Sequence, residues 1–220
     1  MLRARILAPV MVAALAVTGC GSAESGGAPA ASGQTRVDVS PLRESHHDFE
    51  PAASPEALVK TGRHAVIAAG TVEGIQQGGE APLQAGDEQG LLQVVMKVRV
   101  TDEYRVRAAG QVKDGAVYVG LWQGPRYNDA NGTPEYTLQE WNKAIPKGTT
   151  VMLFLQPQAG GAGVKGAPAG AKIMTPDVQG IIFEDGGRLL GGIEELEGEW
   201  KQIGSLAQLK QRVQKQVAKN

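Results

Sequence analysis

The chain has a single cysteine, Cys20, among its 220 residues, so no disulfide can form within it. Aromatic residues are also scarce, at 5%, and histidine occurs only three times. Net charge is nearly absent, because 22 Lys and Arg balance 23 Asp and Glu. A general nucleic-acid-binding surface needs a basic patch or stripe, which this balance does not favour. Because no disulfide can form within the chain, the folded part must be stabilised by its apolar core alone.

Long hydrophobic runs are missing as well. The main apolar stretch, residues 6–17, follows Arg3 and Arg5 and is interrupted by Pro9. It has about a dozen residues, whereas a membrane-spanning helix needs roughly 20. A positive start, a short apolar segment and the small residues Thr18 and Gly19 are the layout of a secretory signal peptide. We therefore expect residues 1–19 to be an export signal and not a transmembrane anchor.

The end of this stretch, Val17-Thr18-Gly19-Cys20, resembles the lipobox of bacterial lipoproteins, in which an aliphatic and two small residues precede a cysteine. The family usually has leucine where Val17 stands. The resemblance implies a diacylglyceryl group on the Cys20 thiol, cleavage before Cys20 and often acylation, for instance by palmitate. Each buried methylene of an acyl chain adds about 0.8 kcal/mol of membrane binding. We therefore expect a lipid-anchored protein on the extracytoplasmic face of the cell membrane.

Without the signal, 20 basic residues stand against 23 acidic ones, a net charge of −3. Residues 20–53 are rich in Gly, Ala, Ser and Pro, which predicts a lipidated, flexible tether. His46, His47 and Asp48 lie in this tether, but a metal site needs several converging ligands, and the only other histidine is His64. We therefore predict no metal. Residues 54–220 have the length of one domain.

The middle of the chain has the patterning of β-strands. From Val94 to Val100, apolar residues at even positions alternate with residues such as Lys97 and Arg99, a period of two that predicts a half-buried strand. Asp114-Gly115 offers a tight turn before the next strand. We predict strands at residues 64–75, 91–106, 116–122 and 150–155, and a final hairpin at residues 179–184 and 188–191.

A helix is predicted at each end of this β-rich region. Ser54 is an N-cap before Pro55 at the first helical position, which predicts a short helix over residues 55–61. Ser205 and Gln208 fit a capping box, and four apolar residues then fall on one helical face. Those residues are Leu206, Leu209, Val213 and Val217. The pattern predicts a mainly β domain: a small antiparallel OB-like barrel (or a sandwich) with a short N-terminal helix and a C-terminal amphipathic helix.

Three segments also make the folded part similar to uncharacterised extracytoplasmic lipoproteins of high-GC Gram-positive bacteria, that is, actinobacteria. The segments are Gly70-Thr71-Val72, residues 148–155 ending in Phe154-Leu155, and residues 179–183 before Asp185-Gly186. They span about two thirds of the chain and are structural motifs. The resemblance implies a cell-envelope lipoprotein and brings no catalytic residue with it.

The catalytic and cofactor motifs that the sequence offers are incomplete. Residues 161–166 match G-x-G-x-x-G, but no helical pattern follows to hold a pyrophosphate, which predicts a Gly/Ala loop and no cofactor. Neither G-x-S-x-G nor S-x-x-K occurs. His64 falls in a predicted strand, where we expect a surface position. Glu194, Glu195, Glu197 and Glu199 suit a solvated acidic loop, and less readily the acid/base pair of a hydrolase.

Half of the ten aromatic residues cluster between positions 118 and 141. They are Tyr118, Trp122, Tyr127, Tyr136 and Trp141. Aromatic faces beside fixed polar groups stack on sugars or anchor partner proteins. The candidate ligand or partner surface therefore consists of Trp122, Arg126, Tyr127, Tyr136 and Trp141. The alternative is that these aromatics close one end of the core.

Taken together, these features predict a non-catalytic binding or accessory module of the cell envelope, anchored in the membrane through lipid on Cys20. The expected partner is an envelope protein or a cell-wall glycan, and not nucleic acid. The alternative is an envelope hydrolase that uses carboxylates of the 184–199 stretch. A third possibility is a structural lipoprotein without any small ligand.

Overall fold

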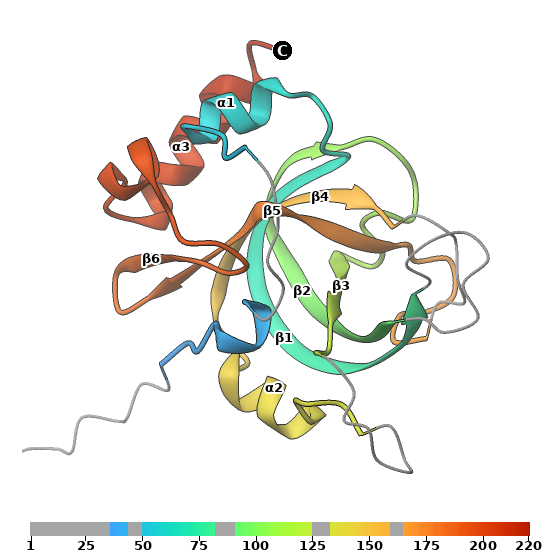
Figure 1. Cartoon of the computed structure of the whole chain (residues 1–220). Helices are drawn as coiled ribbons and strands as arrows, with labels where there is room; N and C mark the ends of the chain where they lie inside the picture. Colours follow the sequence, from blue (N-terminus) through green and yellow to red (C-terminus); the bar gives the residue numbers. More distant parts are fainter. Residues whose placement is uncertain (1–35, 44–49, 82–90, 125–132, 159–164) are drawn as a thin grey trace, which may run out of the picture. The chain divides into compact units, whose positions relative to one another are not determined.

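The computed structural model describes residues 36–43, 50–81, 91–124, 133–158 and 165–220. In these ranges the chain is mainly β, with six strands in one sheet and three α-helices (Figure 1). The elements, in chain order, are 3-10 helix η1 (Ser40–Leu42), α1 (Pro55–Lys60), β1 (Val66–Ala81), β2 (Leu91–Val106), β3 (Ala116–Trp122), α2 (Leu138–Ala144), β4 (Thr150–Pro157), β5 (Ile173–Asp185), β6 (Arg188–Gly191), 3-10 helix η2 (Gly198–Gln202) and α3 (Leu206–Val217).

Five of the strands form a ring of hydrogen-bonded neighbours. The sheet order is β3-β2-β1-β4-β5-β6, and all of these neighbours are antiparallel. A short parallel pairing of β3 with β5, through Tyr118 opposite Ile173, joins the two ends and leaves β6 outside the ring. Strand β1 bends to pair with both β2 and β4. Gly70 allows β2 to approach β1 closely, because a Cβ on this residue would lie only 2.2 Å from the Arg99 carbonyl oxygen.

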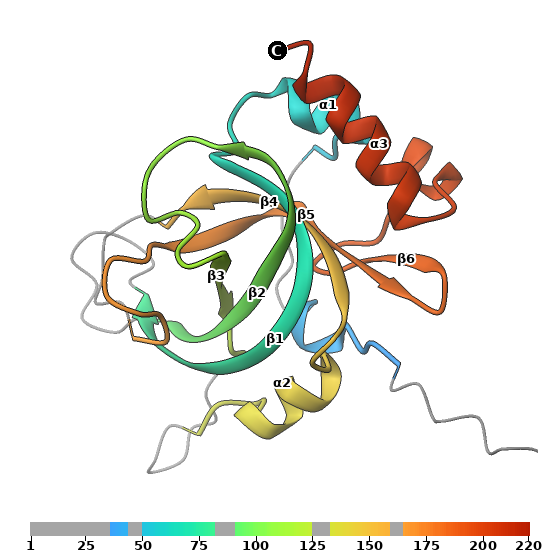
Figure 2. The same cartoon turned by 180° about the vertical axis from the view of Figure 1, so that it is seen from behind.

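The main core lies inside this ring. Alternate residues of all five ring strands belong to one buried cluster, as the period of a strand requires. It includes Val66, Val72, Met96, Val98, Val119, Leu121, Val151, Leu153, Met174 and Phe183. Trp141 and Ile145, from α2 and the residue after it, are buried in the same cluster. Figure 2 shows α2 at the end of the strands opposite α1 and α3.

A second core lies between the outer face of the sheet and the helices. Strand residues that point away from the ring, such as Ile67 and Phe154, pack with Trp200, Leu206 and Leu209. In both views α1 and α3 lie side by side over this face (Figures 1 and 2). The Arg212 guanidinium on α3 holds the Glu56 carboxylate of α1 through two hydrogen bonds of 2.6 and 2.7 Å.

The helix ends follow the predicted chemistry with one difference. The Ser205 hydroxyl accepts a hydrogen bond from the Gln208 backbone N–H, as predicted. The Gln208 side chain, however, accepts from the Gly204 N–H and not from that of Ser205, so the capping box is incomplete. Ser54 caps α1 through the Ala57 N–H. A full capping box, Thr137 with Glu140, begins α2, which the sequence interpretation had missed.

The strand predictions agree with the structure for β2 and β3 but are too short for β1 and β5. Strands β2 and β3 have the predicted bounds, and Asp114 and Gly115 form the predicted turn, with φ of 52° and 71°. Strand β5 begins at Ile173, earlier than predicted, and contains Pro176, which opposes Leu155 next to a shift in register. Proline has no N–H to donate to a neighbouring strand, so it is tolerated at such an irregularity. For the same reason, a proline in the sequence pointed away from a strand there.

The folded unit also begins earlier than the predicted boundary at residue 54. Val37 and Leu42 are buried in the main core, and the Asp38 N–H donates to the Ala144 carbonyl at 2.8 Å. Residues 36–43 therefore belong to the domain and not to a tether. Val39 packs on the same core, but these apolar residues are few within the Gly-, Ala-, Ser- and Pro-rich residues 20–53, so composition did not predict their burial.

Candidate functional site

The predicted aromatic surface is divided between the core and the outer face of the sheet. Trp141 is 0% exposed and belongs to the core, so it is not a surface residue. Tyr136 is half-buried against the same core. Trp122, at the end of β3, is half-buried too, but it belongs to none of the apolar cores. Arg126 and Tyr127 lie outside the described residues. Of the described aromatics in the predicted surface, Trp122 is thus the candidate for contact with a ligand.

Trp122 lies on the outer side of the β2–β3 pair. It stands opposite Gln93, and the next outward pair toward the middle of the strands is Gly120 opposite Val95. Val94 and Leu121, which alternate with these residues, point into the ring core. We call the outward residues Gln93, Gly120 and Trp122, with Gln158 after β4, the β2–β3 face.

Glutamine amides surround Trp122 on and beneath this face. Gln158 Nε2 donates to Gln93 Oε1 at 3.2 Å, which links the end of β4 to the start of β2. Gln77 Nε2 donates to the Gln93 carbonyl at 3.0 Å and to Gln123 Oε1 at 2.7 Å. Gln123 in turn donates to the Tyr136 carbonyl. These bonds fix the amides, so their remaining polar atoms are preorganised.

The β2–β3 face keeps an unsatisfied donor and an unsatisfied acceptor. Trp122 Nε1 and Gln158 Oε1 are buried and have no hydrogen-bond partner in the described part of the chain. Buried polar atoms nearly always find a partner, from protein, water or ligand. The space over Gly120 is already filled, because a Cβ there would lie 3.1 Å from Gln158 Oε1 and 2.8 Å from an Ile173 methyl. The face therefore holds one N–H and one carbonyl oxygen without a partner among the described residues, both below its surface.

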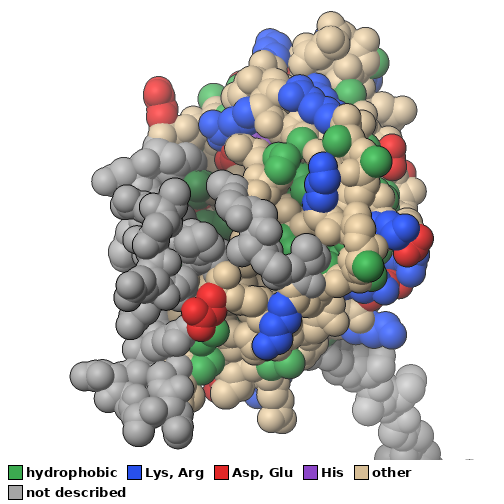
Figure 3. Space-filling model, turned by 90° about the vertical axis from the view of Figure 1, so that its right-hand side faces the viewer, with side chains coloured by type: hydrophobic (Ala, Val, Ile, Leu, Met, Phe, Trp, Pro, Cys, Tyr) green, Lys and Arg blue, Asp and Glu red, His purple; other side chains and the backbone are tan. Residues whose placement is uncertain are grey.

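Farther along the same strands, two basic side chains share one carboxylate. Lys97 Nζ and Arg99 Nε lie 2.7 and 3.0 Å from the Glu73 carboxylate. The hydrogen bonds from Lys97 and then Arg99 lower the pKa of Glu73. Figure 3, which views the right-hand side of Figure 1, shows hydrophobic and basic side chains interleaved on that side. One carboxylate against two cations leaves a single positive charge in this cluster.

The carboxylates of the 184–199 stretch do not converge. Glu184 accepts from the Leu206 N–H at the start of α3, and Asp185 lies 3.4 Å from Arg36. Glu195 is paired with Arg43, and Glu199 with Arg212. Each of these four carboxylates has its own structural partner. These four carboxylates are therefore held by different groups and not as an acid/base pair, and the hydrolase remains the alternative.

His64 is buried and not at the surface position that the sequence suggested. It is 0% exposed, precedes β1, and its Nε2 donates to Asp177 Oδ2 at 3.0 Å. Its ring also meets Phe154 edge-on, with centroids 5.6 Å apart. The Asp177 carboxylate lies 2.5 Å from Arg63 Nη2. A pair enclosed in this way cannot reach a substrate, so we assign it to stability.

The described residues contain no group of three or more His, Cys, Asp and Glu side chains that could hold a metal ion. His46, His47 and Asp48, and most of the G-x-G-x-x-G motif, lie outside these residues. Within the described ranges, none of the helices has the length and apolar character needed to cross a membrane. No protein-family model matches the chain, and no curated protein matches its sequence.

Proposed function

We propose that the protein is an extracytoplasmic lipoprotein of the cell envelope, anchored through lipid on Cys20, and that its folded domain is a non-catalytic binding module. The observation that supports the anchor is the Val17-Thr18-Gly19-Cys20 segment directly after a short apolar run. Two or more acyl chains make anchoring stable, since a single chain gives only marginal binding. The domain begins near residue 36, so at least the residues between Cys20 and Arg36 separate it from the membrane.

We infer further that the ring of strands is an OB-like barrel. In that fold five strands close a Greek-key barrel, and ligands bind on the face of strands 2 and 3 and the loops beside it. The order of the ring, its β3–β5 pairing and the position of α2 between β3 and β4 support this assignment. The β2–β3 face lies on the corresponding surface.

The ligand that this face suits best is a neutral glycan of the cell wall. An indole ring stacks on a sugar face, and amides exchange hydrogen bonds with hydroxyls. Trp122, Gln93 and Gln158 provide these groups, with Trp122 Nε1 and Gln158 Oε1 still unsatisfied. A nucleic acid would require basic side chains beside the aromatic, yet Lys97 and Arg99 are already bound to Glu73.

Replacing Trp122 with alanine should weaken binding to purified cell-wall glycan about tenfold or more, equivalent to about 1.4 kcal/mol. The variant loses both the stacking surface and the Nε1–H donor. Co-sedimentation with insoluble cell walls, stripped of protein, measures the affinity. The Trp122→Phe variant keeps a smaller aromatic ring for stacking and removes the N–H. We expect an intermediate affinity from it.

The Lys219→Ala variant serves as the control, because Lys219 lies beyond α3 and is exposed. Thermal unfolding should show that all three variants remain folded. Wild-type protein that fails to sediment with the cell walls, or a folded Trp122→Ala variant that binds as well as the wild type, would contradict the glycan proposal.

A further inference from the structure

A groove of about 660 Å³ runs along strand β6, away from the β2–β3 face. Its walls are residues 187–191 of the β5–β6 hairpin, residues 36–39 with Arg43, and six residues around η2: Glu195, Leu196, Trp200, Lys201, Ile203 and Gly204. In Figure 1 the hairpin projects between η1 and the chain leading to α3. The groove is open and large enough for several side chains of a ligand.

One wall of this groove is the free edge of the sheet. Strand β6 is the last in the sheet order, and β5 is its one partner among the described strands. Gly186 and Gly187, with φ of 56° and 80°, form the two-residue turn of the hairpin. Asp185 and Arg188 flank such a turn as a hydrogen-bonded pair. Alternation along the strand then directs the N–H and C=O of Leu189 away from β5, into the groove.

Arg43 provides independent support for this orientation. By the same alternation, the Gly191 carbonyl also faces away from β5. The Arg43 guanidinium takes up this carbonyl, since Nη2 donates to it at 2.9 Å and Nε donates to the Gly192 carbonyl at 3.3 Å. The Arg43 side chain therefore satisfies the backbone carbonyl at the Gly191 end of the β6 edge. No described residue satisfies Leu189 in this way.

The groove has an apolar floor and a basic rim. Trp200 and Ile203 are buried beneath it, and Leu189 and Leu196 are half-buried. Four basic side chains line the groove against two acidic ones. The lining therefore has a surplus of positive charge, although Asp38 keeps its own charge: Ser40 donates two hydrogen bonds to Asp38, and Glu195 pairs with Arg43.

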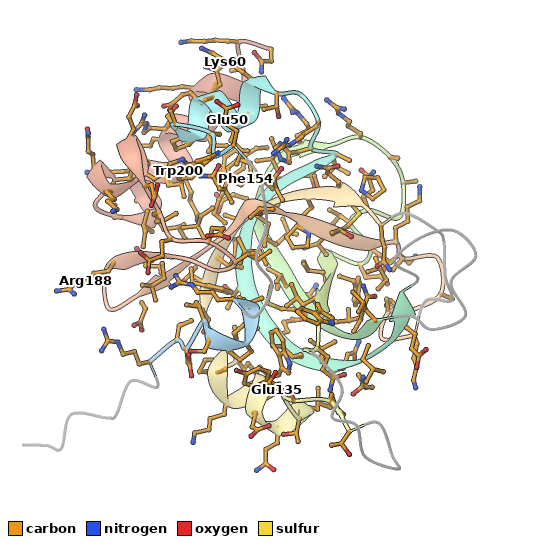
Figure 4. The ribbon with its side chains drawn as sticks, viewed as in Figure 1. Glu50, Lys60, Glu135, Phe154, Arg188 and Trp200 are labelled. Atoms are coloured by element: carbon orange, nitrogen blue, oxygen red, sulfur yellow. The ribbon has the colours of Figure 1, made fainter. Side chains whose placement is uncertain are left out.

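Three of the basic side chains are available to a partner. Arg188 and Lys201 have no ion-pair partner among the described residues, and Figure 4 shows Arg188 pointing outward from the hairpin. Arg36 lies 3.4 Å from Asp185 but is 82% exposed, so this pair adds little. The free charge around the edge is therefore positive.

We propose that the β6 edge binds an extended, acidic peptide segment of another protein by strand addition. The Leu189 N–H and C=O pair with the peptide backbone, alternate peptide side chains reach the apolar floor, and acidic side chains meet Arg188 and Lys201. A second copy of this chain fits less well. Pairing of β6 with itself would bring the basic side chains of both copies together, and like charges across a strand pair are unfavourable.

The test uses a fluorescent peptide of alternating Glu and Val, with both ends blocked, and the purified full chain in detergent. We expect saturable binding by fluorescence anisotropy, and binding at least tenfold weaker to an Arg188→Glu/Lys201→Glu variant. That variant should instead prefer a Lys-Val peptide. The Lys219→Glu variant, which changes one charge outside the groove, should bind like the wild type. Methylation of every second backbone nitrogen of the peptide can be placed on either of two alternating sets. It should abolish binding for one set, because strand addition requires the N–H groups of that set.

Three results would overturn the proposal. The first is the absence of saturable binding, and the second is equal weakening by Lys219→Glu, which would indicate general charge attraction. The third is a dimer without peptide that Arg188→Glu disrupts, which would assign the edge to a second copy. The Trp122→Ala variant should bind the peptide normally, so a failure of the glycan proposal remains distinguishable from a failure here.

Discussion

The Trp141→Ala variant should lose about 3–5 kcal/mol of unfolding free energy. Trp141 is among the largest fully buried side chains, and it fills the end of the ring core from α2. Its removal leaves a cavity that backbone hydrogen bonds of five strands prevent from collapsing. Urea unfolding followed by circular dichroism measures the change. A loss of this size is a large part of the stability of a single domain.

The matched control is Trp141→Phe. Trp141 Nε1 is buried without a partner in the described part of the chain, so phenylalanine removes an unsatisfied donor together with part of the ring. We expect a much smaller loss, about 1 kcal/mol. If alanine at this position left the unfolding midpoint unchanged, Trp141 would be exposed in solution, and the placement of α2 against the core would be wrong.

The Asp177→Ala variant should have the second-largest effect, a loss of about 3 kcal/mol at neutral pH. Asp177 is 6% exposed, accepts a hydrogen bond from His64 and forms an ion pair with Arg63. Without the carboxylate, the buried His64 Nε2 loses its acceptor, and His64 Nδ1 already has no partner among the described residues. The side chain of Arg63 is half-exposed and can turn to water, which keeps the loss near the lower end for buried pairs.

Asp177 also predicts how stability depends on pH. Burial raises the pKa of its carboxyl, but the His64 hydrogen bond and the charge of Arg63 outweigh this and lower the pKa below its ordinary value of 3.8. A lowered pKa adds stability above the ordinary value, and this stability disappears as pH falls through the lower, folded value. We therefore expect the difference in stability between wild type and Asp177→Asn to shrink below about pH 4. A difference in stability that stayed constant down to pH 2 would show that the charge of Asp177 adds nothing to the free energy of unfolding.

Much of the fold was predictable because it depends on local patterns. Alternation with a period of two gave the bounds of β2 and β3, and the Asp114-Gly115 turn has the positive φ values that its residues favour. Helix α2 was missed because its seven residues, 138–144, contain only two large apolar residues that pack on the core, Leu138 and Trp141, too few to show a helical period. The start of β5 was missed because Pro176 interrupts the strand pattern.

The candidate site was predictable only in part, because burial depends on contacts between distant segments. Trp122 and Trp141 look alike in sequence, yet the β-strand directs one outward and the helix directs the other into the core. The partner of His64 is 113 positions away, so no local pattern could indicate its burial. The sheet edge at β6 is also a property of topology. The Gly-Gly turn predicted the hairpin, but not that β6 has a free side.

The intact mass of the protein recovered from the membrane fraction of a bacterial host tests the central claim most directly. We predict a chain that begins at Cys20 and carries lipid-sized additional mass, and a Cys20→Ala variant that lacks this mass and leaves the membrane fraction. This result would place the β2–β3 face and the β6 groove at the cell surface, where glycans and envelope proteins are available to bind. An unmodified chain released to the medium, or a membrane-bound chain that retains residues 1–19, would contradict the lipoprotein account.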